Sequence, residues 1–419
     1  MTSREFPLSS QINTMGTSLK ILSISATFPS SADPTRGVFV KERLRALASI
    51  SGVQLRVVSP TPWFPPIKMF KKWYRWSQYP QREQVSGLTV DNPRYLLPPK
   101  IGGYFHPQLI DFAATKRVDQ IHQEFPFDLI DAHWVYPAGA WAVKLGQRYG
   151  VPVFMTGRGE DMARFPDLPL VGNKIRWALK QATGCIGVSQ EISQLMIDNG
   201  ASVERVCTVA NGIDTEKFQA KEKSACRKAC SLPQDRPIVL SVGDRLELKG
   251  FHLVAQAIAE VKKNISNVLY VIVGGPGRHG RDYTQVIEAI IQKLDLQDNV
   301  LMVGPKPHSE LIDWYNAADL YAMMSSREGS PNVLLESLAC GTPVVGHAVG
   351  GIHDELADQR MGRLIMERSA PAAAAAILEE LNNPKDRAQI ALAMQDRTWR
   401  ATANRVHQFF QDVVSKSGC

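Results

Sequence analysis

Two glutamates, Glu328 and Glu336, flank the stretch whose residue types best suit chemistry on a ligand. The residues directly after the first of them are Gly329, Ser330, Pro331 and Asn332. Ser330 suits a helix cap, and Pro331 suits the first turn because its missing N–H would have no partner inside the helix. The spacing therefore predicts a short helix that starts directly after an apolar strand, at residues 319–325.

The two carboxylates restrict what this helix end could bind. Free N–H groups and the positive end of the helix dipole favour phosphate there. Carboxylates beside a phosphate would repel it unless they accept hydrogen bonds from neutral hydroxyl groups. A sugar and a ribose supply such hydroxyls on either side of a diphosphate, so the pattern favours a nucleotide sugar. A lone pair of glutamates is more often a pair of solvated helix-end charges, and the flanking residues decide between the two interpretations.

A diphosphate leaving group also needs positive charge. Arg245 and Lys249 follow the strand at 237–243, and each can form a charge-assisted hydrogen bond. No Asp-x-Asp pair is present, so the sequence predicts a site without a metal ion.

Short runs rich in Val and Ile alternate with helical patterns along most of the chain, which predicts an α/β protein with parallel sheets. Strands are expected at 20–26, 53–59, 127–133, 151–156, 184–189 and 205–210, and again at 237–243, 268–275, 299–304, 319–325 and 342–348. We expect two doubly wound, Rossmann-like domains with ligands at the carboxyl ends of their strands, in a cleft. The predicted segments are an extension (1–18), a first domain (19–210), a charged linker (211–236), a second domain (237–395) and a C-terminal helix packing across the domains (396–419).

The stretch 325–351, SSREGSPNVLLESLACGTPVVGHAVGG, resembles the donor-binding motif of glycosyltransferase family 4, whose members have the GT-B fold. Three more stretches resemble family segments in the expected order: DLIDAHW (128–134), VANGIDTEKF (209–218) and SVGDRLELKGF (241–251). One departure is that Asp244 follows Gly243 where the family usually has arginine, so that Arg245 lies one place later.

The resemblance implies a glycosyltransferase that retains anomeric configuration and uses a nucleotide-sugar donor, UDP- or GDP-linked, with no other cofactor. It places Glu328, Gly329, Ser330, Pro331, Asn332 and Glu336 at the donor, Lys249 and Arg245 at the diphosphate, Gly37 close to the substrates, and His133 near the reacting centre. In GRGED (157–161), Arg158 stands where relatives often have histidine, while Asp161 remains, and both are expected to contact the acceptor. That acceptor is expected to be a saccharide or a lipid-linked saccharide, as in the synthesis of cell-surface polysaccharide or glycolipid.

Other functions fit parts of the same sequence. Gly275, Gly277 and Gly280 form a G-x-G-x-x-G pattern after a strand, as in dinucleotide-binding proteins. That pattern belongs on the first strand of a domain, whereas here it follows the second. A sugar-nucleotide epimerase of the same fold, or a non-catalytic nucleotide- or saccharide-binding protein, also remains open.

The segment 61–82 is basic and aromatic, with five Lys or Arg residues and no acidic residue. Such a segment could dock on an anionic membrane surface or bind a nucleic acid. It could also be an ordinary solvated loop that covers its own domain. We favour the membrane, because no recognised nucleic-acid-binding module is present.

The overall composition indicates which classes of protein the sequence fits. With 419 residues, 44% hydrophobic and 21% charged, the chain is typical of a globular enzyme, and its net charge of +7 suits an anionic partner. Six cysteines without a Cys-x-x-Cys pair indicate neither a zinc site nor a disulfide framework. No apolar run is long enough to span a membrane and the first 18 residues do not resemble a signal peptide, so a cytoplasmic protein, at most peripheral at the membrane, is expected.

Overall fold

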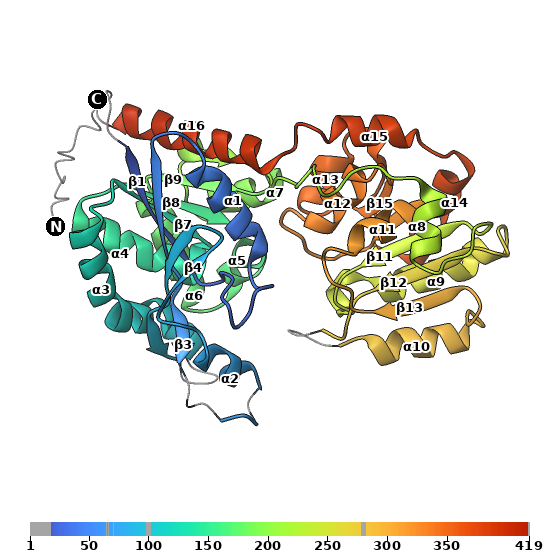
Figure 1. Cartoon of the computed structure of the whole chain (residues 1–419), viewed down its shortest axis with the longest axis horizontal. Coiled ribbons are helices and arrows are strands. Elements are labelled where there is room, and N and C mark those ends of the chain that lie inside the picture. Colours follow the sequence, from blue (N-terminus) through green and yellow to red (C-terminus); the bar gives the residue numbers. More distant parts are fainter. Residues whose placement is uncertain are drawn as a thin grey trace. The chain divides into compact units, whose positions relative to one another are not determined.

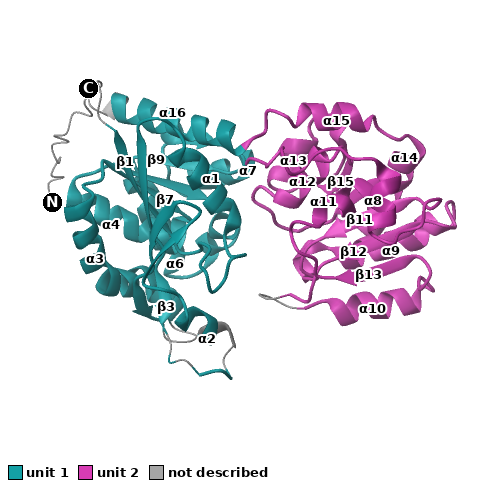
Figure 2. Ribbon diagram, viewed as in Figure 1, with its two compact units in different colours: residues 1–211, 399–419 teal, residues 212–398 magenta. Residues whose placement is uncertain are grey.

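The chain divides into two compact units. The structure is a computed structural model that describes residues 18–63, 65, 67–69, 71–97, 102–277 and 282–417, without the side chains of 71–73 and 416–417. Unit 1 comprises residues 1–211 and 399–419, and unit 2 comprises residues 212–398 (Figure 2). The predicted extension, apart from Ser18, lies outside the described residues, and so do Gly280 and Cys419.

Unit 1 is built on a mainly parallel sheet. Its described strands are β1 (Leu19–Ser25), β2 (Val53–Val58), β3 (Thr61–Trp63), β4 (Arg82–Val85), β5 (Leu88–Asp91), β6 (Arg94–Leu96), β7 (Leu129–His133), β8 (Val153–Gly157), β9 (Gly184–Gly187) and β10 (Val206–Thr208). Within the described residues, eight of them form one sheet in the order β10-β9-β8-β7-β1-β2-β5-β4, in which only the β4/β5 pair is antiparallel. Strands β3 and β6 form a separate parallel pair.

Helices cover both faces of this sheet (Figure 1). The described helices of unit 1 are α1 (Val38–Ala48), α2 (Lys71–Ser77), α3 (His106–Glu124), α4 (Ala140–Tyr149), α5 (Glu160–Ala163), α6 (Val171–Gln181), α7 (Gln190–Asp198) and α16 (Trp399–Ser417). Alternate residues of the strands serve the two faces: Leu22 and Ile130 join the core with α3, α4 and α6, whereas Ile21 and Leu129 join the core with α1 and α16. The strands are buried on both sides, as their apolar runs predict.

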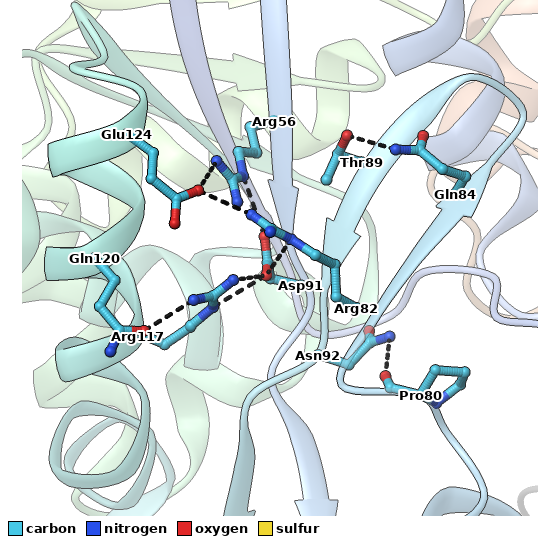
Figure 3. Close-up of polar contacts among 10 residues, drawn as sticks. All are labelled: Arg56, Pro80, Arg82, Gln84, Thr89, Asp91, Asn92, Arg117, Gln120 and Glu124. Atoms are coloured by element: carbon cyan, nitrogen blue, oxygen red, sulfur yellow. Dashed lines mark hydrogen bonds and ion pairs between the residues drawn. The ribbon is translucent and has the colours of Figure 1, made fainter.

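The edge of the sheet is fastened by an ion-pair cluster (Figure 3). Asp91 is fully buried, and its carboxylate accepts hydrogen bonds from Arg56 Nε (3.2 Å) and Arg117 Nη2 (2.6 Å). Arg82, opposite Asp91 in the β4/β5 hairpin, lies 3.3 Å from the same carboxylate and also binds Glu124 at 3.0 Å. A carboxylate buried without such partners would cost several kcal/mol, about 3–5 when one partner is lost, so the cluster is what makes the burial of Asp91 tolerable.

The C-terminal helix belongs to unit 1. Within α16, Val406, Phe410 and Val413 are buried in the same core as α1 and strand β1. The amphipathic pattern predicted such a buried face, and these side chains complete the core of unit 1. That the helix also packs across both domains stays a prediction.

Unit 2 has the simpler sheet. Its strands are β11 (Ile238–Val242), β12 (Leu269–Val273), β13 (Val300–Gly304), β14 (Leu320–Met323), β15 (Val344–His347) and β16 (Gly362–Ile365). Over the described residues they form one parallel sheet in the order β13-β12-β11-β14-β15-β16. This is the strand order of a doubly wound nucleotide-binding fold, in which connections reverse direction between the first and fourth strands.

The helices of unit 2 also form two layers. They are α8 (Lys223–Ala229), α9 (Phe251–Lys262), α10 (Thr284–Lys293), α11 (Leu311–Ala317), α12 (Asn332–Ala339), α13 (Gly351–Leu356), α14 (Ala370–Asn382) and α15 (Arg387–Ala393). One core contains α9, α10 and α14, and the other contains α8, α11, α12, α13 and α15. The fold class is therefore the predicted one, with two parallel-sheet α/β domains.

The segment 211–236, for which we expected a linker, carries helix α8 and packs within unit 2 from residue 212 onward. Cys226 is buried in the core, and Arg227 donates to the Ala317 carbonyl and to Asp319. Six lysines and arginines in this stretch hid the buried face of a helix only seven residues long.

None of the described helices combines the length and apolar character needed to cross a bilayer.

Candidate functional site

The loops that follow β11 and β14 start from neighbouring strands, at the point where the strand order of unit 2 reverses. In such sheets ligands bind beyond the carboxyl ends of the strands at this point. Lys249 ends the short 3₁₀ turn Glu247–Lys249 ahead of α9, and Glu328 lies between β14 and α12. Lys249 Nζ donates a hydrogen bond to Glu328 Oε1 at 2.7 Å. The fold thus brings together two predicted site residues that are 79 positions apart.

The Lys249–Glu328 pair is close to the surface. The Lys249 side chain is 24% exposed and that of Glu328 is 11% exposed. A ligand can therefore reach both groups, the ammonium to bind an anionic oxygen and the carboxylate to accept from a hydroxyl.

The backbone around Glu328 is held by two glycines that start α13. A Cβ on Gly350, whose φ is +53°, would lie 2.1 Å from the Glu328 carbonyl oxygen. The Gly351 N–H donates to the Gly329 carbonyl at 2.7 Å. Residues 328 and 329 are thereby packed directly on the start of α13, so a side chain at position 350 would displace Glu328.

Helix α12 begins one residue later than the sequence predicts. Asn332 is its first residue, and Pro331 rather than Ser330 is the N-cap. The reason is the ψ of 112° at Pro331, which is extended and not helical. Gly341 follows the end of the helix in a left-handed conformation, with φ of +75°, which glycine adopts readily.

Glu336 lies within α12, and its side chain is only 6% exposed. Its Oε2 accepts from the Tyr315 hydroxyl at 2.8 Å, and its Oε1 contacts His308 Nε2 at 2.7 Å. Burial and the neighbouring Glu336 carboxylate raise the pKa of Tyr315 well above its ordinary value, so the phenol keeps its proton. Both carboxylate oxygens thus have partners inside unit 2.

Arg245 is bound into its own loop. Its Nη1 donates to the Gly274 carbonyl at 2.5 Å, its Nε donates to Thr284 Oγ1 at 2.8 Å, and its side chain is nearly buried. It links the loop after β11 to the loop after β12, which contains Gly275 and Gly277. Among the described residues, no group of three or more His, Cys, Asp or Glu side chains is placed to hold a metal ion.

In unit 1, the corresponding reversal lies between β1 and β7. Gly37 follows β1 and is the N-cap of α1, with φ of +66°. A Cβ there would lie 2.3 Å from the Thr27 carbonyl oxygen. The close packing of two backbone segments accounts for glycine at this position.

His133 ends β7, next to β1 in the sheet, and is fully buried. Its Nδ1 contacts Arg158 Nη2 at 2.7 Å, and its Nε2 lies 3.3 Å from Asp131 Oδ2. Arg43 binds both oxygens of Asp131 at 3.0 Å and the Thr156 hydroxyl at 2.7 Å. The ring of His133 is therefore enclosed between a cation and an anion of the protein.

The electrostatics of this cluster fix the state of the histidine. Burial lowers the pKa of His133 to about 3, although Asp131 opposes the shift, so the ring is neutral at pH 7. Arginine can only donate, so Nδ1 accepts from Arg158 and the ring proton is on Nε2. Burial would raise the pKa of Asp131, but Arg43, the largest of the opposing influences, and its other neighbours bring it below the ordinary value.

Asp161 shapes the turn that carries Arg158. Its carboxylate accepts from the backbone N–H groups of Val135, Arg158 and Gly159, each at 2.9 Å. Arg158 also donates to Asn211 Oδ1 at 2.9 Å and lies over the Phe39 ring at 5.3 Å. The structure thus brings His133, Arg158 and Asp161 together, as their positions at the ends of adjacent strands β7 and β8 suggest.

Several partners of these residues were missed by sequence reasoning. They are Arg43 and Asp131 in unit 1, and His308, Tyr315 and Lys217 in unit 2. Asp131 had a usable signal, because it lies two residues before His133 and so points to the same face of the strand. The others had none, because their partners are far away in the sequence.

Comparison with known proteins now identifies the family. Residues 37–217 match the family described as Glycosyltransferase Family 4, and residues 222–397 match Glycosyl transferases group 1. D-inositol 3-phosphate glycosyltransferase 2 of Catenulispora acidiphila is 30% identical over 331 residues, which cover 74% of this chain and 76% of that protein. The chain belongs to glycosyltransferase family 4. The predicted family is confirmed.

Further relatives agree with a glycosyltransferase. TuaC of Bacillus subtilis, which carries the name of a teichuronic acid biosynthesis glycosyltransferase, is 28% identical over 365 residues, covering 86% of this chain and 88% of that protein. Two solved structures share the GT-B fold of this glycosyltransferase. Sucrose-phosphate synthase from Thermosynechococcus elongatus has a TM-score of 0.75 at 21% identity, covering 95% of this chain and all of that one. Anabaena HepE in complex with UDP has a TM-score of 0.71 at 18% identity, covering 94% and 100%.

Proposed function

We propose that this glycosyltransferase binds a UDP- or GDP-linked sugar on unit 2 and transfers the sugar, with retention of configuration, to a saccharide or lipid-linked saccharide. The observation that carries the proposal is the Lys249–Glu328 pair at the strand-order reversal of unit 2. A cation for phosphate and a carboxylate for hydroxyl groups stand side by side there, as a sugar diphosphate requires. HepE, which shares the fold, was solved with UDP.

Each donor contact follows from the chemistry of one side chain. Lys249 exchanges its bond to Glu328 for bonds to the diphosphate, and its positive charge stabilises the leaving group. Glu328, released from Lys249, accepts from hydroxyls of the sugar, and Glu336 accepts from those of the ribose. Arg245 can turn toward the diphosphate only by breaking its hydrogen bonds to Gly274 and Thr284. Lys249 therefore contributes more of the positive charge that stabilises the diphosphate.

The buried cluster of unit 1 serves the acceptor indirectly. We assign His133 to positioning, because both ring nitrogens already face protein groups and its side chain is fully buried. It orients Arg158, while Asp161 fixes the backbone of the turn. Acceptor contacts then come from the loop after β8.

Retention and independence of metal ions complete the proposed reaction. Asp131 and Asp161 are both fully buried and bound to protein groups, so neither is placed as an exposed nucleophile. Attack on the same face from which the phosphate departs then accounts for retention. Proton NMR of the new anomeric coupling, with and without EDTA, measures both features: an inverted product or complete loss of activity in EDTA would refute the respective part.

The test of the donor is a panel of nucleotide sugars and nucleoside diphosphates scored by thermal shift. A ligand at 100 times its Kd stabilises the protein by about 2.7 kcal/mol, so one nucleotide sugar should stand out. Product analysis follows with donor alone and with donor plus saccharide. Conversion of the donor to another nucleotide sugar without acceptor would indicate an epimerase, and binding without nucleotide release would indicate a non-catalytic protein.

We further propose that the segment 61–82 docks on an anionic membrane surface. Of its described side chains, Trp63, Ile67 and Met69 are exposed, with Lys68 between the last two. Phe64, Phe70 and the side chains of 71–73 lie outside the described residues. Co-sedimentation with vesicles containing phosphatidylglycerol should be strong at low salt and weak at 0.5 M salt, because exposed charges are screened. Equal binding to neutral vesicles would refute the charge-based docking.

A further inference from the structure

Glu336 has two partners of unlike kind. Tyr315, on α11, is fully buried, so the bond from its hydroxyl to Glu336 Oε2 is protected from water. His308 lies between β13 and α11, outside regular structure, and its side chain is 53% exposed. One partner is therefore built into the core, and the other stands at the surface.

The hydrogen-bonding roles of the two ring nitrogens of His308 follow from their neighbours. Lys217 Nζ lies 2.9 Å from His308 Nδ1, and an ammonium group has only donors. Nδ1 must then accept, which places the ring proton on Nε2 and makes Nε2 the donor to Glu336 Oε1. Lys217, His308 and Glu336 form a continuous series of hydrogen bonds, and the Phe218 ring packs beside the imidazole at 5.2 Å.

This series of hydrogen bonds occupies Glu336 Oε1, which a ligand hydroxyl would need as its acceptor. Glu336 is 6% exposed, and the exposed imidazole bonds to the oxygen that Tyr315 does not occupy. Each carboxylate oxygen can accept two hydrogen bonds, but the little of Glu336 that is exposed lies beside the imidazole that bonds to Oε1, so a hydroxyl donating there competes with His308.

From this we infer that His308 is a latch on Glu336 that competes with the ribose hydroxyls of the donor, while Tyr315 is the positioning residue that holds the carboxylate in place. The inference rests on the proposed role of Glu336 in binding a nucleotide. Binding of the donor breaks the hydrogen bond between His308 and Glu336. The bond between Glu336 and Tyr315 persists with and without the donor. The two partners of one carboxylate therefore act on donor affinity in opposite directions.

The experiment compares the Kd of UDP and GDP for four proteins by calorimetry. Replacing His308→Ala removes the competitor, so nucleotide should bind about two- to tenfold more tightly, as expected for loss of one competing hydrogen bond. His308→Gln is the matched control, because its side-chain amide can keep an N–H near the place of Nε2 and should restore most of the wild-type Kd. Tyr315→Phe should weaken binding about two- to tenfold.

Kinetics separate positioning from damage to the fold. For Tyr315→Phe we expect a higher KM for the nucleotide sugar with kcat within twofold of wild type, and an unchanged melting temperature of the UDP-free protein within about 4 °C. A fall in kcat without a change in KM would contradict the positioning role.

The outcomes also separate this inference from the function beneath it. If wild type and His308→Ala bind nucleotide equally well, or if His308→Ala binds more weakly, the latch is refuted while the donor site stands. If none of the four proteins binds UDP or GDP, the proposed function fails and the latch with it.

Discussion

The polar residues of the two units differ in what they can still bind. In unit 1, His133, Asp131 and Asp161 are fully buried, and their contacts are to other groups of the protein. In unit 2, Lys249 and His308 are partly exposed, and each bonds a carboxylate that a ligand can compete for. A fully buried hydrogen-bond network fixes the shape of loops, whereas a partly exposed one can exchange a protein partner for a ligand. Residues that a family motif singles out can therefore act at different distances from the substrate.

The largest expected effect tests whether the unit 1 cluster is structural. Arg43→Leu leaves Asp131 buried without its bidentate partner, which should lower the free energy of unfolding of unit 1 by about 3–5 kcal/mol. Hydrogen exchange read by mass spectrometry should show loss of protection in peptides from 18–211, with those from 212–398 unchanged. The control is Arg45→Leu, an exposed arginine of the same helix. Equal protection in both variants would mean that Asp131 does not need Arg43.

The next effect tests the accessible pair of unit 2. Lys249→Ala should lower the rate of sugar transfer about 10–150-fold, equivalent to about 1.5–3 kcal/mol for a lost charge-assisted bond to the leaving group. Steady-state kinetics measure it, and Lys263→Ala, an exposed lysine after α9, is the control. A rate equal to that of the control would remove Lys249 from the mechanism.

A pH series sharpens the contrast further. The unfolded chain protonates histidine near pH 6.5, whereas burial lowers the pKa of His133 to about 3 in the folded protein. Protonation therefore favours unfolding, and His133 alone should lower the stability of unit 1 by up to about 1.4 kcal/mol per pH unit as the pH falls below 6.5. His106, whose pKa burial lowers to about 4, adds to this slope in the same direction. Hydrogen exchange between pH 6.5 and 5 measures this slope, corrected for the intrinsic exchange rate.

His133→Asn is the variant that isolates this contribution. The asparagine oxygen can accept from Arg158 but does not titrate. The slope should flatten in unit 1 peptides and stay as it was in unit 2 peptides. A wild-type slope in the variant would assign the pH dependence to other groups.

The smallest expected effect tests whether unit 2 can be destabilised without a change in the activity of its site. Asp386 caps α15 by accepting from the N–H groups of Ala388 and Gln389. Asp386→Ala should cost about 1 kcal/mol in unit 2, with sugar transfer unchanged. Differential scanning calorimetry and kinetics measure the two quantities, and a lower transfer rate would show that stability and activity of unit 2 are coupled.

Much of the fold follows from local sequence. The strands of the two central sheets stand out because they are buried on both faces and consist of Val- and Ile-rich runs. The edge hairpin was missed, since REQV and LTVD in β4 and β5 carry polar residues for the Arg56–Asp91 cluster. Helix α8 was missed because it is only seven residues long and three of those residues are lysine or arginine.

The candidate site also contains residues that local sequence predicts and others that it does not. Glu328, Glu336 and Lys249 could be proposed as site residues because spacing within one loop or helix is a local property. The partners of Glu336 come from residues 28 and 21 positions away, and Arg43 is 88 positions from Asp131. Such pairings depend on strand order and on helix packing, which periodicity does not encode. The geometry also distinguishes an enclosed histidine from an accessible one, and sequence does not.

The assignment of α16 to unit 1 has a consequence for how the protein is made on the ribosome. Synthesis runs from the amino terminus, and domains generally fold as their chains emerge. Unit 2 is complete once residue 398 has emerged, but the apolar surface that receives Val406, Phe410 and Val413 stays uncovered until the last helix is synthesised. The unit whose translation begins first therefore lacks part of its core until α16 has emerged, and until then Phe154 in β8 lacks the Phe410 ring that lies 4.4 Å from its own in the folded protein.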